Sequence, residues 1–288
     1  MIVILYSVGG RFAMTNELPR AEELVTSEGF MMCAAKSGLK LLFAFTALAL
    51  FLCLSQRTAL AQGGPPMLTD DPDTPGNNHW EINTAFTLEK EEGKKDFAAP
   101  FVDINYGLGR RLQLKVEVPY HMMWEGGEHA KAGFGSVNFG VKWRFYETER
   151  HHFAVSTYPQ FEYKPAAAVR RGTAEPGNEL LLPLEVTRKA GPVDVNVEVG
   201  YRIRQFFRDE LLYGVAVGRD VTKRLELAAE VHGEPKRGFR DDDRIANFGA
   251  RYRLTKHYTF LFSAGRSLRA AREGVPSLVM YAGLQFTH

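Results

Sequence analysis

Residues 193–204 read Val-Asp-Val-Asn-Val-Glu-Val-Gly-Tyr-Arg-Ile-Arg, and this stretch decides the fold. Apolar residues occupy every odd position, and polar or small residues occupy every even position. Successive side chains of a β-strand point to opposite faces of its sheet. One face of this strand is therefore entirely apolar, while the other carries Asp194, Glu198, Arg202 and Arg204. The two faces must border very different surroundings.

The same alternation recurs beyond residue 78 and predicts about twelve strands, each of about ten residues. The expected spans are 79–89, 97–107, 111–121, 136–147, 152–164, 179–189, 193–204, 210–219, 224–233, 245–254, 257–267 and 277–287. Strands of this length, tilted from the membrane normal, are long enough to cross a bilayer.

Short and long connections alternate between these strands. The short ones cover 107–110, 148–150, 190–192, 220–223 and 255–256, and the longer ones cover 90–96, 122–135, 165–178, 205–209, 234–244 and 269–276. Short periplasmic turns and longer outer loops are typical of outer-membrane barrels. The pattern predicts an all-β fold, an antiparallel up-and-down transmembrane β-barrel of about 12 strands over residues 79–288.

A secreted β-sandwich is the main alternative, because its strands also alternate between apolar and polar residues. Three features favour the barrel. The segments are long for a sandwich, aromatic residues such as Trp80, Tyr201 and Tyr258 lie near segment ends, and the second face is charged rather than merely polar. Aromatic girdles and a wet interior are properties of membrane barrels.

Composition excludes several other classes. The chain has 288 residues, and it lacks the repeated apolar runs of about 20 residues that a helical membrane protein needs. An aromatic content of 12% excludes a wholly disordered chain. A net charge of +2 gives no basic excess for nucleic acid. The two cysteines, Cys33 and Cys53, cannot build a disulfide framework or a cysteine-based zinc site.

The N-terminal region matches a secretory signal peptide over residues 31–61. Lys36 and Lys40 precede an apolar run over 41–54, and a small-x-small site predicts cleavage between Ala61 and Gln62. Lipidation at Cys53 is a weaker alternative, because Leu52 stands where a small residue is expected. Residues 1–30 precede this complete signal and are interpreted as a mis-assigned upstream extension. Residues 62–78 are then expected to form a periplasmic N-terminal segment.

The start of the expected mature chain carries a family resemblance. Residues 64–74 read Gly-Pro-Pro-Met-Leu-Thr-Asp-Asp-Pro-Asp-Thr, and His-Trp-Glu follows at 79–81. This opening resembles a bacterial outer-membrane family named for the meta-pathway of phenol degradation, whose members are often described as transporters. Residues 100–107, 135–145 and 261–266 are also similar to it. The resemblance implies an outer-membrane channel for small aromatic or poorly soluble compounds.

The C-terminus departs from what this resemblance implies. Barrels of this type commonly end in an aromatic residue that the barrel-assembly machinery reads. Here Phe286 is followed by Thr287 and His288, and His288 occupies the terminal position on the outward face. Recognition by that machinery is therefore expected to rest on Phe286.

The inward face of the barrel is the best candidate for a functional surface. The charged residues expected to line the lumen are Lys115, Glu117, Lys142, Arg144, Glu162, Lys164, Glu198, Arg202, Arg204 and Arg251. Mixed signs indicate a weakly selective or partly occluded lumen. The same charges could instead only hold neighbouring strands in register, because opposite charges across a strand pair stabilise a sheet.

Other motifs favour structural roles. Thr69-Asp-Asp-Pro-Asp73 is rich in carboxylates, but it lacks the glycine and glutamate spacing of a calcium loop, so a solvated segment at the periplasmic mouth is expected. His151 and His152 are adjacent and would point oppositely on a strand, which predicts a turn rather than a metal site. No spacing of serines suggests a catalytic triad, and no metal, cofactor or catalytic residue is predicted.

The sequence therefore predicts a passive channel in the outer membrane of a Gram-negative bacterium, and not an enzyme. Membrane lipid and the assembly machinery are the expected partners, together with a small-molecule solute that the sequence does not identify. A non-conducting scaffold barrel is the alternative, and a lipid-acting membrane hydrolase is a more distant one.

Overall fold

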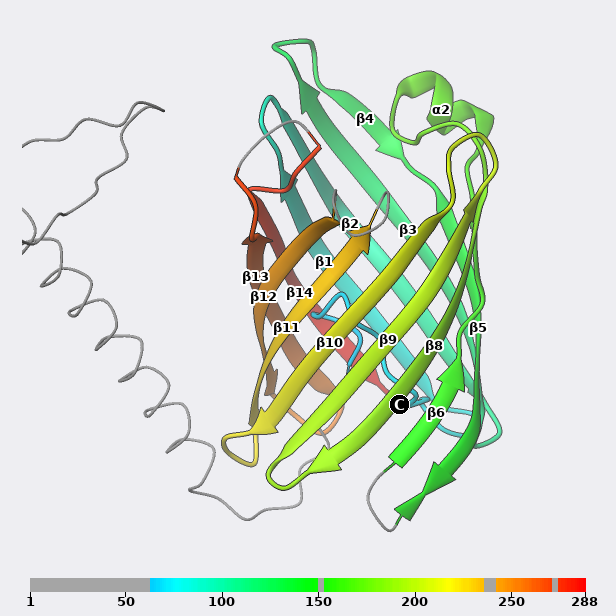
Figure 1. Ribbon diagram of the computed structural model, residues 1–288, viewed down its shortest axis with the longest axis vertical. Helices are drawn as coiled ribbons and strands as arrows, with labels where there is room; N and C mark the ends of the chain where they lie inside the picture. Colours follow the sequence, from blue (N-terminus) through cyan, green and yellow to red (C-terminus); the bar gives the residue numbers. More distant parts are fainter. Residues whose placement is uncertain (1–62, 150–152, 236–241, 271–273) are drawn as a thin grey trace, which may run out of the picture. The chain divides into compact units, whose positions relative to one another are not determined.

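The computed structural model describes residues 63–149, 153–235, 242–270 and 274–288 (Figure 1). The strands are β1 (Trp80–Lys90), β2 (Lys94–Leu108), β3 (Leu112–Glu125), β4 (Lys131–Phe134), β5 (Val137–Thr148), β6 (Phe153–Thr157), β7 (Gln160–Tyr163), β8 (Glu179–Ala190), β9 (Val193–Arg204), β10 (Glu210–Asp220), β11 (Leu225–Pro235), β12 (Asp242–Arg253), β13 (Tyr258–Ser267) and β14 (Leu278–Thr287). Every pairing between them is antiparallel.

These strands form a closed barrel of twelve, which confirms the predicted fold. β1 pairs with β14, so the sheet has no free edge there. β4 and β5 are two parts of one strand, since the Gly135 amide still donates to the Pro119 carbonyl between them. β6 and β7 are likewise continuous across Pro159, whose carbonyl accepts from Val141. Proline lacks an amide donor, which explains the local interruption of the ladder.

The short turns lie at one end of the barrel and the longer connections at the other (Figure 1). The boundaries differ from the prediction mainly at the long-loop end, where β3 continues to Glu125 and β4 begins at Lys131. The expected loop over 122–135 is therefore much shorter. The connection over 165–178 contains a short helix, α2 (Ala166–Arg171), which ends at Gly172 with the left-handed φ of 74° that glycine readily adopts.

Exposure is inverted relative to a water-soluble protein. On β9 the side chains of Val199 and Tyr201 are 53% and 45% exposed on the outside, while Glu198 is 3% exposed on the inside. The same sorting holds around the barrel, where large exposed apolar residues face outward and most of the buried polar residues face inward. An apolar exterior around a polar interior is the arrangement of a membrane barrel. No helix in the described part of the chain is long and apolar enough to span a membrane.

Candidate functional site: the lumen and the segment inside it

Residues 63–73, here called the luminal segment, lie inside the barrel (Figure 1). Thr69 is fully buried, and Asp71 is 5% exposed. The interpretation of Thr69–Asp73 as a solvated segment at the mouth is therefore wrong. The physical reason is that the wall of the barrel supplies charged partners for the polar atoms of this stretch, which replace the water it would otherwise require.

Two carboxylates of the wall accept hydrogen bonds from the tip of the luminal segment. Glu230 on β11 accepts from the backbone amides of Leu68 and Thr69, each at 2.8 Å. Glu198 on β9 accepts from the next amide, that of Asp70, at 2.9 Å. Three consecutive N–H groups thus bind two buried carboxylates, and hydrogen bonds to ionised acceptors are among the stronger ones.

A basic side chain holds the beginning of the luminal segment. The Arg251 guanidinium on β12 donates to the carbonyls of Gly63 at 2.7 Å, Gly64 at 2.8 Å and Pro65 at 3.0 Å. The same group is paired with Glu226 at 2.7 Å. Most of this recognition is of backbone atoms, so it depends on the path of the chain more than on its side chains.

Side-chain contacts hold the end of the luminal segment. The Lys142 ammonium on β5 lies 2.8 Å from the Asp70 carboxylate, donates to the Asp71 carbonyl, and lies 4.6 Å from the centre of the Tyr158 ring. Arg144 pairs with Asp73 at 3.0 Å. Burial, with the charges of Asp73 and Asp70, raises the pKa of Asp71 to about 7, so the bound segment favours protonated Asp71.

Two inward-facing glycines make room for the luminal segment. A Cβ atom at Gly214 on β10 would meet the side chain of Thr69, and one at Gly249 on β12 would meet Met67. Glycine inside a strand often marks the close approach of another piece of backbone. The wall is thus shaped to accept this segment.

Cavities lie on both sides of the luminal segment. One of about 460 Å³ opens toward the long-loop end and is lined by Met67, Leu68, Phe101, Met280 and Tyr281 among others. Another of about 190 Å³ lies toward the short-turn end and is lined by Asp71, Lys142 and Arg251. Gly64, Pro65 and Asp70 of the segment line both cavities, so the segment lies between them.

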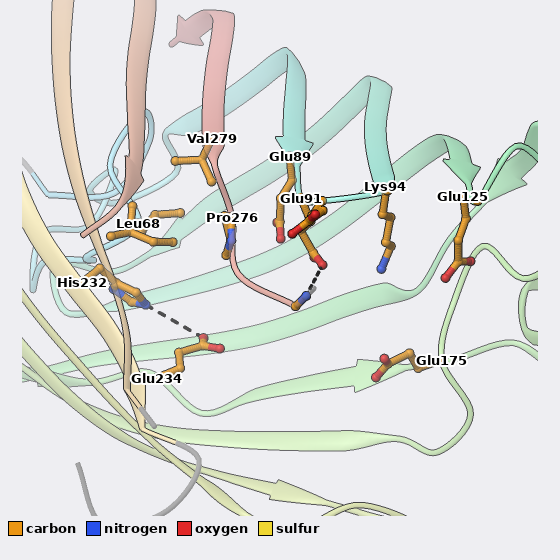
Figure 2. A pocket seen from close by; sticks show the side chains of 15 residues that line it. Leu68, Glu89, Glu91, Lys94, Glu125, Glu175, His232, Glu234, Pro276 and Val279 are labelled. Carbon is orange, nitrogen blue, oxygen red and sulfur yellow. Dashed lines mark hydrogen bonds and ion pairs between the residues drawn. The ribbon is translucent and has the colours of Figure 1, made fainter. Parts of the chain in front are cut away.

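The mouth at the long-loop end is acidic. Figure 2 shows a cavity of about 710 Å³ lined by carboxylates from several elements, with His232 lying 3.9 Å from Glu234. Glu91 accepts a hydrogen bond from the Gly274 amide at 2.8 Å, and Lys94 is a basic residue in this lining. The acidic members are Glu89, Glu91, Glu92, Glu125, Glu175 and Glu234.

The structure places the ten predicted lumen residues in three groups. Lys142, Arg144, Glu198 and Arg251 contact the luminal segment. Lys115 pairs with Glu117 at 2.8 Å. The remaining four join a ladder of alternating charges on neighbouring strands. In it Lys164 lies 2.7 Å from Glu179 and 3.9 Å from Glu162, Arg204 lies 3.0 Å from both Glu179 and Glu210, and Arg202 lies 2.9 Å from Glu234.

Sequence reasoning missed Glu230 as a site residue. Its only signal in the sequence was its place in the alternation. Like Glu226 and His232, it stands at an even-numbered position on the polar face of β11. His151, His152, Ala61 and Gln62 lie outside the described residues. Within the described ranges, no group of three or more His, Cys, Asp or Glu side chains is arranged to hold a metal ion.

The barrel is similar to solved outer-membrane channels. The COG4313 outer membrane channel from Pseudomonas putida F1 matches with a TM-score of 0.56 and 12% identity, over 79% of this chain and 99% of that one. NanC porin matches with a TM-score of 0.53 and 9% identity, over 71% and 98%. KdgM porin matches with a TM-score of 0.50 and 12% identity, over 71% and 98%. No family model and no curated protein matches the sequence.

Proposed function

We propose that this chain is a channel of the bacterial outer membrane through which small molecules pass when the luminal segment moves. The observation that carries the proposal is the lumen itself, a polar interior closed by a single short segment. That segment is held largely through hydrogen bonds to its backbone. Water in the lumen can replace these bonds when the segment leaves, so each one contributes only about 1.5–3 kcal/mol net, and the segment can leave without unfolding the wall.

The export route follows the sequence interpretation. A signal peptide over residues 31–61 directs the chain out of the cytoplasm, and the assembly machinery inserts the barrel with its short turns in the periplasm. The opening at 64–74 resembles the family named for the meta-pathway of phenol degradation. The luminal segment shares residues 64–73 with this opening, so the most specific part of the resemblance coincides with the part that lies inside the lumen.

The larger inner cavity supports a solute with apolar surface. Its volume of about 460 Å³ falls within the usual range of small-molecule sites. Phe101, Tyr281, Leu212 and Met280 contribute apolar lining, beside the charged Lys115 and Arg202. We therefore assign small aromatic or otherwise poorly soluble molecules as the solute class, and the ten charged lumen residues as the lining of their path.

Flux through the wild-type protein tests this function. Reconstituted in planar bilayers, it is expected to give discrete conductance steps of low amplitude, because the luminal segment, once displaced, still occupies part of the pore. Proteoliposomes are expected to swell faster in benzoate than in a sugar of similar mass. A non-conducting scaffold barrel would give neither steps nor swelling above heat-denatured protein.

A further inference from the structure

A groove on the outside of the barrel lies at its long-loop end, where β1, β2 and β3 meet their turns. It has a volume of about 490 Å³ and is lined by Lys90, Glu91, Gly93, Lys94, Lys95, Trp124, Glu125 and residues 126–128. It lies at the rim of the barrel, where Glu91, Lys94 and Glu125 also line the acidic mouth of the lumen. Lys90 itself is on the outward face of β1, which also carries the 58% exposed Phe86.

The groove holds two lysines at directly facing positions. Lys90 and Lys95 are cross-strand partners in the β1–β2 pair, and both are exposed. Like charges at facing positions destabilise a strand pair unless a counter-charge lies between them. No carboxylate of the described residues lies within 4.0 Å of either ammonium group.

The carboxylates that line the same groove already have partners. Glu91 accepts the Gly274 amide at 2.8 Å. Glu125 and Glu128 lie 3.6 Å and 3.3 Å from Lys131. Within the part of the chain that the structure describes, Lys90 and Lys95 therefore have no carboxylate partner in direct contact, although glutamates also line the groove.

Trp124 fixes the level of this charge relative to the membrane. It is the cross-strand partner of Lys95 on β3 and is 43% exposed. Toward the barrel middle, the outward face of β1 and β2 is apolar, with the rings of Phe86 and Phe97 stacked at 6.2 Å. Exposed tryptophan marks the interface between hydrocarbon and water, so the lysines lie at headgroup level and the aromatic rings at acyl-chain level.

We infer that this groove binds a lipid that carries phosphate groups, with the phosphate between Lys90 and Lys95 and the acyl chains along Phe86 and Phe97. A lipid fits better than a soluble anion, because the basic pair sits directly above an apolar surface that only acyl chains would cover. Lipid binding in this groove is distinct from the channel activity, and it requires that the long loops face the cell exterior.

Native mass spectrometry of the detergent-purified protein tests the site. The probes are diphosphoryl lipid A, monophosphoryl lipid A and phosphatidylcholine. The wild type is expected to bind diphosphoryl lipid A most tightly and phosphatidylcholine least. The double variant Lys90→Gln/Lys95→Gln is expected to bind diphosphoryl lipid A about 25-fold more weakly, since each lysine near a lipid surface contributes about fivefold.

The matched control is Lys223→Gln/Lys256→Gln, which removes two exposed lysines from the short-turn end. It should bind as the wild type does, and all three proteins should show the same heat-dependent gel shift. Equal weakening in both double variants, or phosphatidylcholine bound as tightly as lipid A, would overturn the site. Displacement of bound lipid A by millimolar inorganic phosphate would show that the groove recognises phosphate alone, and would overturn the lipid assignment.

Discussion

Replacing Val197 by Arg is expected to reduce assembly of the barrel sharply. Val197 lies midway along β9 on its outward face, between Val186 of β8 and Val215 of β10. Arginine there would place a charge in hydrocarbon, at a cost of about 2–4 kcal/mol near the midplane. Losses of this size are a large fraction of the stability of a typical domain. Little of the variant should show the heat-dependent gel shift of a folded barrel or reach the outer-membrane fraction.

Glu198→Gln is the control, because it changes the very next residue on the opposite face. Its side chain stays in the polar lumen, where an amide oxygen still accepts from the Asp70 amide. Assembly should therefore survive. Normal assembly of Val197→Arg would show that the outward face does not contact lipid, and would replace the membrane barrel with a soluble one.

Deleting residues 63–73 is expected to raise the single-channel conductance severalfold. The deletion removes the whole luminal segment and joins the two inner cavities. The wall groups that lose partners, chiefly Glu230, Arg251 and Lys142, face a lumen that then fills with water, so folding should be retained. Planar-bilayer recording of the refolded variant measures the effect.

A lumen variant without contact to the segment separates opening from a simple charge effect. Glu117→Gln removes one lumen charge, and Glu117 pairs with Lys115 rather than with the segment. It should shift ion selectivity but leave the conductance near that of the wild type, since lumen charges set selectivity. Unchanged conductance in the deletion would mean that the segment does not close the pore.

The barrel wall could be predicted because strict alternation of apolar and polar residues fits only one facing of each strand. In residues 193–204 a shift by one position would place valines in the lumen and charges in lipid. The sequence therefore determines which side chains of β9 point toward lipid. The interruption at Pro159 was less visible, because the ladder continues on both sides of it. The short connections were also predictable, since they interrupt the alternation only briefly.

The luminal segment could not be predicted, because it has no periodicity of its own. Its hydrogen-bond partners Glu230 and Glu198 lie 161 and 128 positions away from Thr69 and Asp70. Its carboxylates look solvated when read alone, and only the wall supplies the basic groups that bury them. Gly214 and Gly249 were the available signal, since glycines stand on the inward faces of β10 and β12 where the segment passes.

A reversible covalent tether between the luminal segment and the wall tests the central claim most directly. Residues 62–288 contain no cysteine, so in a protein expressed from residue 62 a pair introduced as Thr69→Cys and Gly214→Cys would be the only thiols. A Cβ atom at Gly214 lies 3.0 Å from that of Thr69. A disulfide needs roughly 3.5–4.5 Å, which a small shift of the segment supplies. The Thr69→Cys single variant serves as the control.

The measurement is the single-channel conductance of this double variant before and after reduction. We predict that the oxidised protein stays closed to benzoate and shows only residual conductance, while reduction restores the steps of the wild type. The single variant should respond to neither condition. Full conductance in the oxidised double variant would contradict the account, because solutes would then pass a segment that cannot move.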